Sequence, residues 1–167
     1  MDVSNQFQGE LSAAVIPRPG EVTVLKSTLR RPRTGEVRIR LEGCGVCASN
    51  LVPWAGPDWM QFPTEPGGLG HEGWGRIDAL GDGVETLTVG DRVAALTYHA
   101  YASHDFAAQD MIVPLPTALA EEPFPGEPLG CAMNIFRRAD IQAGHTVVVI
   151  GIGFLGALLT RLASRAR

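Results

Sequence analysis

The segment Thr146–Gly156 (TVVVIGIGFLG) runs from a Val/Ile strand pattern into a Gly-x-Gly-x-x-Gly turn. An apolar pattern at helical spacing follows it: Leu155, Leu158, Leu159 and Leu162. The segment therefore predicts a buried strand that starts at Thr146, then a tight turn and a helix. We expect Gly151 to permit the turn, Gly153 to let the backbone approach a ligand, and Gly156 to let the helix pack close to the strand.

A strand, this glycine turn and a helix, in that order, are typical of the first unit of a Rossmann fold that binds NAD or NADP. The unpaired N–H groups and the positive dipole end of the helix would face the pyrophosphate. We therefore expect the cofactor-binding residues to be Gly151, Gly153, Phe154, Leu155 and Gly156. An ordinary βα turn, in which the glycines serve only packing, is the alternative.

The chain ends soon after this unit, at Arg167. The acidic residue that binds the ribose in a Rossmann unit lies about 20 residues after the glycines, near or beyond that end. One strand and one helix cannot form a doubly wound sheet, and the strand would leave both of its edges unpaired. The sequence therefore predicts a Rossmann domain truncated at its C-terminus.

The composition is that of a globular protein, with 45% hydrophobic residues and a net charge of −4. That charge argues against nucleic acid as a main partner. The sequence has no run of about 18 apolar residues, so it predicts no membrane span. The N-terminus lacks the pattern of a signal peptide. The odd number of cysteines, 3, fits a reducing compartment, so we expect a cytoplasmic location.

The first part of the chain is rich in short strand patterns separated by glycine and proline turns. The expected strands are Ala13–Ile16, Val22–Leu25, Glu36–Glu42, Gly73–Leu80, Gly90–Leu96 and Phe106–Val113. The predicted organisation is a mainly β domain over residues 1–126, a connecting helix within 127–145 and the first βα unit of a Rossmann α/β domain over 146–167. The helix pattern itself covers Leu129–Ala139.

Three segments offer thiol, imidazole and carboxylate groups: Gly43–Asn50 (GCGVCASN), Gly70–Gly73 (GHEG) and Glu127–Cys131 (EPLGC). A catalytic zinc takes about three such ligands and keeps one position open. Zinc there would polarise an alcohol oxygen, so that hydride can leave the carbon. A hydroxyl beside the metal, such as that of Ser49, would pass the proton onward.

With these segments the chain resembles the medium-chain, zinc-dependent alcohol dehydrogenase family, in its polyol and secondary-alcohol branch. The resemblance runs from Ala13 to Ala166, and its most specific pieces are Gly43–Ser49, Gly70–Gly75, Val89–Val93 and Gly151–Gly156. It implies a GroES-like catalytic domain joined to a Rossmann domain. It further implies hydride transfer from a secondary alcohol or sugar-derived hydroxyl to NAD(P), and homo-oligomers formed through a complete Rossmann domain.

By this resemblance, Cys47 and His71 take the places of two zinc ligands, and Glu72 binds or supports the metal. Glu127 lies 24 residues before Gly151, as the acidic ligand does in the polyol branch, and is favoured as the last ligand. Cys131 is the other candidate for that ligand. Ser49 matches the residue that hydrogen-bonds the substrate hydroxyl, which makes Ser49, Cys47 and His71 the expected catalytic set.

The chain departs from the family pattern at several positions. Asn50 stands where an Asp is common, and Val52 stands where a His often relays the proton. The four-cysteine lobe of a structural zinc site is absent, because the stretch after Ala95 holds His99 and His104 but no cysteine before Cys131. Both histidines are expected on a surface loop near the substrate cleft and are given no role.

Other interpretations stay open at this point. Cys44 and Cys47 form a Cys-x-x-Cys that could be a redox pair, although Cys44 is better explained as a small buried residue. His71 could be merely structural, and Glu127 could be an acid stabilised by a helix N-terminus. The chain could also be a zinc-binding but inactive remnant, or a zinc-free relative of the quinone reductase type.

Overall fold

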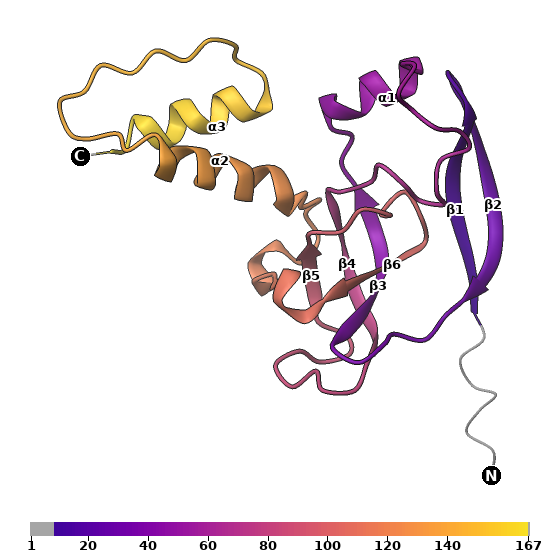
Figure 1. The fold of residues 1–167 in the computed structure, drawn as a ribbon. Coiled ribbons are helices and arrows are strands. Elements are labelled where there is room, and N and C mark those ends of the chain that lie inside the picture. The colour runs from indigo at the N-terminus through magenta and orange to yellow at the C-terminus, as the bar shows by residue number, and fades with distance from the viewer. Residues whose placement is uncertain (1–8, 167) are drawn as a thin grey trace. The chain divides into compact units, whose positions relative to one another are not determined.

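The computed structural model describes residues 9–166, which fall into two compact units, Met1–Pro125 and Gly126–Arg167. The first unit holds all of the strands assigned among these residues, and the second holds two helices (Figure 1). Each unit is described by itself. Among the described residues, no helix has both the length and the hydropathy that a membrane crossing requires.

The first unit is built on a five-stranded antiparallel sheet with the order β6-β3-β4-β5-β7. Its strands are β3 (Glu36–Cys44), β4 (Gly73–Leu80), β5 (Arg92–Ala95), β6 (His104–Ala108) and β7 (Ile112–Pro114). Short helical segments lie between them: α1 (Leu51–Ala55) and the 3₁₀ turns η2 (Ala48–Asn50) and η3 (Gln109–Met111). A further 3₁₀ turn, η4 (Thr117–Leu119), follows β7.

The expected strand Phe106–Val113 was wrong as one continuous element, because η3 divides it into β6 and β7. These two strands lie at opposite edges of the sheet. Four flat strand spacings would separate the edges by about 19 Å, whereas the link from Ala108 to Ile112 reaches about 14 Å at most. The sheet must therefore curl until its two edges approach each other.

The core of the unit lies inside this curled sheet. Its most deeply buried side chains are Val37, Ile39, Ile77 and Val93. Leu87, Ala95, Ala107 and Ile112 complete the cluster. These residues come from every strand of the sheet and from the loop before β5, so strand pairing and hydrophobic burial depend on each other.

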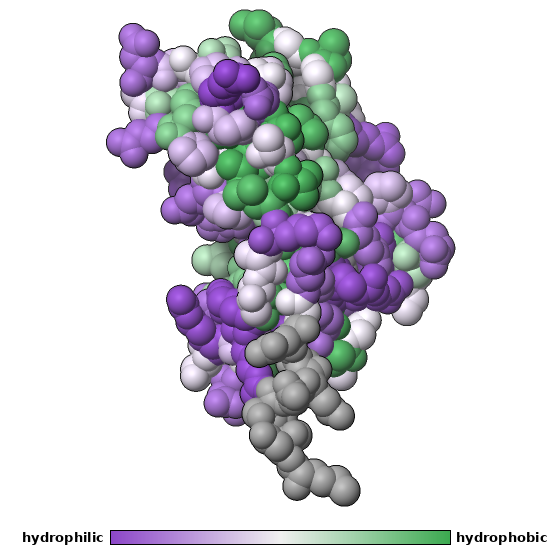
Figure 2. Space-filling model, turned by 90° about the vertical axis from the view of Figure 1, so that its right-hand side faces the viewer, coloured by the Kyte–Doolittle hydropathy of each residue, from purple (hydrophilic) through white to green (hydrophobic). Residues whose placement is uncertain are grey.

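A separate hairpin precedes the sheet. Its strands β1 (Gly9–Arg18) and β2 (Glu21–Leu29) pair antiparallel around a turn at Gly20, whose φ is 71°. An isolated bridge between Ala13 and Ala102 ties the hairpin to the segment before β6. Figure 2 views the molecule from the hairpin side and shows hydrophobic residues among hydrophilic ones. The exposed apolar residues of β2 are Val22, Val24 and Leu25.

Arg92, within the Val89–Val93 motif, binds the segment that follows the last strand of the sheet. Arg92 is nearly buried, and its Nε lies 2.6 Å from Glu42 Oε2. Its two terminal nitrogens donate to the carbonyls of Leu119 and Glu122. One arginine therefore binds the end of η4 and the residues after it to β3 and β5, with charge-assisted hydrogen bonds.

The second unit consists of α2 (Gly126–Arg138) and α3 (Phe154–Ala163), which contact each other. The strand expected from Thr146 was wrong for the described chain, since residues 145–150 pair with no strand. Val148 is 79% exposed and Ile150 97% exposed. A strand needs a neighbour for its N–H and C=O groups, and no other strand is assigned within the described residues of this unit.

Val37→Ala should lower the free energy of unfolding of the first unit by about 2 kcal/mol, because it removes two buried methyl groups and leaves a cavity. Urea denaturation followed by circular dichroism measures the change. The matched control is Val24→Ala on β2, where the side chain is 65% exposed and we expect a change below about 0.5 kcal/mol. Equal losses in the two variants would contradict the assignment of the core.

Candidate metal centre and substrate pocket

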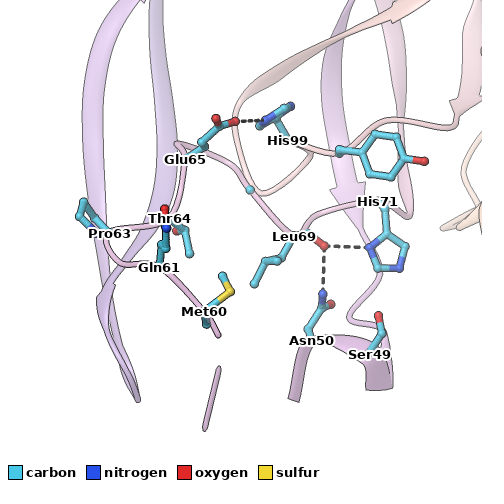
Figure 3. A pocket seen from close by; sticks show the side chains of 12 residues that line it. Ser49, Asn50, Met60, Gln61, Pro63, Thr64, Glu65, Leu69, His71 and His99 are labelled. Carbon is cyan, nitrogen blue, oxygen red and sulfur yellow. Dashed lines mark hydrogen bonds and ion pairs between the residues drawn. The ribbon is translucent and has the colours of Figure 1, made fainter. Parts of the chain in front are cut away.

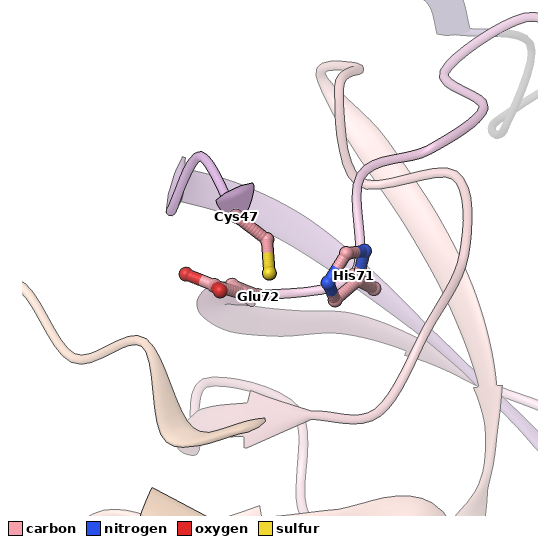
Figure 4. Close-up of side chains that lie close together, drawn as sticks. All are labelled: Cys47, His71 and Glu72. Carbon is pink, nitrogen blue, oxygen red and sulfur yellow. The ribbon is translucent and has the colours of Figure 1, made fainter. Parts of the chain in front are cut away.

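The pairing of β3 with β4 brings two distant motifs together. Cys44, the last residue of β3, lies opposite Gly73, the first residue of β4. The loop after β3 carries Cys47, and the residues just before β4 are His71 and Glu72. Ligand atoms of these three side chains all lie within 4.8 Å of one another, and Figure 4 shows the three side chains close together.

A glycine makes room for the carboxylate in this cluster. A Cβ atom on Gly45 would lie 1.9 Å from Glu72 Oε2, so no other residue fits at that position without displacing the carboxylate. The backbone reinforces the contact, because the Gly45 N–H donates to the Glu72 carbonyl at 3.1 Å. The glycine of the Cys-Gly-Val-Cys segment therefore leaves the space that the Glu72 carboxylate occupies.

The two nearby cysteines have opposite electrostatic environments. Hydrogen bonds with the side chain and backbone of Ser49, together with one between Cys47 and the His71 side chain, lower the pKa of Cys47. Burial raises the pKa of Cys44 to about 11, and its thiol donates to the Gly45 carbonyl. Cys47 is thus the thiol that most readily becomes a thiolate ligand, whereas Cys44 is half-buried and kept protonated.

The three residues fit a divalent metal by their chemistry. Glu72 is 8% exposed, and no lysine or arginine of the described residues forms an ion pair with it. A buried carboxylate beside an acidic thiol is costly without a cation. Thiolate, imidazole and carboxylate are the ligands that zinc takes, at about 2.0–2.3 Å each. The separation of the three ligand atoms is compatible with binding to one zinc ion.

A cavity of about 530 Å³ opens beside this cluster (Figure 3). Its polar lining consists of Ser49, Asn50, Gln61, Thr64, Glu65, His71, Tyr98 and His99, and its apolar lining includes Met60, Pro63 and Leu69. Ser49 and His71 therefore contact both the cavity and Cys47. The sequence pattern gave no signal for Gln61, Thr64 or Glu65, because their loop has no periodicity or motif.

The two histidines after Ala95 have different surroundings. His99 lies on a loop, as expected, and its Nε2 lies 2.9 Å from Glu65 Oε2 on the cavity wall. His104 was expected on a loop, but it is the first residue of β6 and pairs with Arg40 of β3. Its burial lowers its pKa, and its Nε2 lies 3.4 Å from Asp78 Oδ2. It takes no part in lining the cavity.

The remaining ligand candidates lie in the second unit, near the start of α2. Cys131 Sγ donates to Glu127 Oε1 at 2.8 Å, across one turn of the helix. Cys131, the other candidate for that ligand, is exposed. The role of Glu127 as the last metal ligand stays a prediction.

The glycine turn in the second unit is shaped by Gly151 and Gly156. Gly151 has a φ of 95°, which disfavours any residue with a Cβ. A Cβ on Gly156 would lie 2.1 Å from the Gly151 carbonyl, so the helix approaches the turn only because Gly156 has none. Gly153 is the N-cap of α3 and has open space around it. Phe154 and Leu155 follow as the exposed first residues of the helix.

Comparison with known proteins identifies the family to which the chain is similar. The model of the alcohol dehydrogenase GroES-like domain matches residues 33–118. The chain is 33% identical over 162 residues to the probable D-xylulose reductase A of Arthroderma otae, an alignment that covers 78% of this chain and 45% of that protein. It is 28% identical to the erythritol/L-threitol dehydrogenase of Mycolicibacterium smegmatis, with 92% of this chain and 54% of that protein covered.

Solved structures have the same fold. The human synaptic vesicle membrane protein VAT-1 homolog-like protein matches with a TM-score of 0.78 at 25% identity, over 95% of this chain and 53% of that chain. The chain therefore belongs to the medium-chain alcohol dehydrogenase family and carries its GroES-like domain. It spans about half the length of the curated relatives that it matches over most of its own length.

In metal-free protein, iodoacetamide should alkylate Cys47 well before Cys44 at about pH 8, because only the thiolate reacts and the pKa of Cys47 is the lower one. The rate at Cys47 should level off with rising pH below the ordinary thiol pKa of 9.0, whereas the rate at Cys44 should still rise near pH 11. Mass spectrometry of the labelled peptides measures both rates.

Ser49→Ala should move the pH midpoint of Cys47 labelling upward, since it removes the hydrogen bond that most lowers this pKa. Ser27→Ala on β2, where the residue is exposed, is the matched control and should leave the midpoint in place. Equal labelling of Cys44 and Cys47 across the pH range would refute the assigned environments.

Proposed function

We propose that this chain supplies the catalytic domain and the first cofactor-binding turn of a zinc-dependent dehydrogenase that oxidises a polyol or other secondary alcohol with NAD(P). The observation that carries the proposal is the cluster of Cys47, His71 and Glu72 beside a polar cavity. The names of the curated relatives, which include a xylulose reductase and an erythritol/L-threitol dehydrogenase, support the same reaction class.

Cys47 and His71 would hold the metal, with Glu72 as a further ligand or as the charge that stabilises it, and Glu127 would be the last ligand. The metal, when bound, would act as a Lewis acid toward the substrate oxygen. Cys47 is suited to this task because Ser49 and His71 favour its thiolate form. Glu72 contributes negative charge from a buried carboxylate beside Cys47 and His71.

Ser49 is placed to handle the proton of the substrate hydroxyl. It lines the cavity and also hydrogen-bonds Cys47, so a hydroxyl that reaches the cluster would pass it. Val52, the position where the family often has a relay histidine, is exposed on α1. We therefore assign the proton transfer to Ser49 and assign no relay role to position 52.

The charge of the cavity favours a neutral, hydroxylated substrate. Its lining holds amide, hydroxyl, imidazole and carboxylate groups, and no lysine or arginine. A phosphorylated substrate would lie near Glu65, and no lysine or arginine in the cavity wall would pair with its phosphate. A polyol, by contrast, offers several hydroxyl groups that these side chains can hydrogen-bond.

The nicotinamide cofactor would bind at the turn of the second unit. Gly151, Gly153 and Gly156 would let the pyrophosphate approach the N-terminus of α3, and Phe154 and Leu155 would provide backbone N–H groups there. The remainder of such a site, including the residue that distinguishes NAD from NADP, would come from sequence beyond this unit.

The first test is native mass spectrometry of the protein from its source, combined with NAD⁺ and NADP⁺ reduction assays on a panel of polyols. We expect one zinc per chain and cofactor reduction with neutral polyols. Cys47→Ser should lower the zinc content and reduce turnover at least about a hundredfold, because a ligand of the Lewis acid is lost. Zinc-free protein with full polyol oxidation would refute the proposal, and bound zinc without turnover would leave only a metal-binding domain.

Glu65→Ala should raise KM for a polyol about two- to tenfold, with little change in kcat, since it removes a hydrogen-bonding group from the cavity wall. KM for a monohydroxy secondary alcohol should change less. Glu85→Ala, an exposed glutamate outside the cavity lining, is the matched control. Equal effects on both substrates would contradict the role of Glu65 in recognising the distal hydroxyls.

A further inference from the structure

The carbonyl of Leu69 lies between two side chains of the candidate site. His71 Nδ1 lies 2.8 Å from this oxygen, and Asn50 Nδ2 donates to it at 3.0 Å (Figure 3). A carbonyl only accepts hydrogen bonds, so Nδ1 of His71 must carry the proton. The lone pair of a neutral imidazole then lies on Nε2, the nitrogen that a metal would bind.

The backbone is shaped to present this carbonyl. Leu69 has a φ of 73°, a conformation that a bulky side chain rarely adopts. The glycines around it pack against the segment 99–101, where a Cβ on Gly67 would lie 2.3 Å from the His99 carbonyl and a Cβ on Gly70 would lie 2.4 Å from the Tyr101 nitrogen. Packing on both sides holds this segment against residues 99–101, and the amide of Asn50 binds the Leu69 carbonyl oxygen itself.

Asn50 connects this carbonyl to the loop that carries Cys47. Its Oδ1 accepts the Cys47 N–H at 3.2 Å and the Tyr101 hydroxyl at 2.8 Å. The amide thus donates on the histidine side and accepts on the cysteine side. An aspartate carboxylate has no N–H and could not donate to the Leu69 carbonyl, which gives a physical reason for Asn at a position where the family often has Asp.

We propose that Asn50, oriented by Tyr101, is a positioning residue that sets the tautomer of His71 and its spacing from Cys47. The inference rests on the proposed metal site and deepens it. The Asn50 side chain acts through the Leu69 carbonyl on one side and the Cys47 backbone on the other. The expected consequence is that the ligand atoms are held in place before the metal arrives.

Cobalt(II) titration of the metal-free chain tests the proposal, because thiolate binding to cobalt produces a charge-transfer absorption that needs no catalytic turnover. We expect Asn50→Ala to weaken cobalt binding about 10–100-fold. Tyr101→Phe removes one hydroxyl, keeps the ring and should weaken binding about two- to tenfold. Asn134→Ala, an exposed asparagine on α2 in the second unit, is the matched control and should leave the dissociation constant unchanged.

The imidazole itself provides a second readout that a general loss of stability would not move. ¹⁵N-resolved NMR of the metal-free protein should show His71 protonated at Nδ1 in the wild type and a mixture of the two tautomers in Asn50→Ala. Tyr101→Phe keeps the test decisive if Asn50→Ala fails to fold, because it leaves the Asn50 amide in place and removes only one of its hydrogen-bond partners.

The outcomes separate the two proposals. A wild-type chain that binds cobalt, with unchanged affinity and tautomer in both variants, would overturn the positioning role and leave the metal site standing. A wild-type chain that binds no cobalt through Cys47 would overturn the metal site and the positioning role together. Weaker binding in both variants with a shifted tautomer in Asn50→Ala supports the role that we assign.

Discussion

The antiparallel pairing of β3 with β4 is the constraint on which the candidate site depends. Its register sets Cys44 opposite Gly73, so the loop that leaves β3 and the segment that enters β4 must meet at one end of the sheet. The cluster of Cys47, His71 and Glu72 is the direct result. The same two strands contribute Val37, Ile39 and Ile77 to the core, so the free energy that stabilises the sheet also fixes the geometry of the site.

Close backbone packing then determines which side chains the site admits. Gly45 leaves the space that the Glu72 carboxylate fills, and Gly70 lets the histidine loop lie against residues 99–101. The hydrogen bonds of Asn50 link the two loops through Leu69 and Cys47. The ligand side chains are therefore held in place through backbone groups. Polar residues such as Ser49 face them from the cavity side.

Two cysteines three positions apart illustrate how far local sequence goes. Their spacing alone allowed a redox pair, a metal pair or simple packing. In the structure, burial raises the pKa of Cys44, whereas hydrogen bonds with Ser49 and His71 lower that of Cys47. The difference arises from groups that are close in space, and for His71 from a residue 24 positions away in the chain, which no local pattern reveals.

The sequence by itself determined the strand Gly73–Leu80, the glycine turn and the motifs that hold Cys47, His71 and Glu72, because periodicity, turn chemistry and ligand type are local properties. It failed at Phe106–Val113 and at the strand expected from Thr146. Curling of the sheet divides the first segment, and the second has no neighbouring strand among the described residues. Only the tertiary structure decided the cavity wall around Glu65 and His99 and the hydrogen bonds of Asn50, since hydrogen bonds between distant segments exist only once the chain has folded.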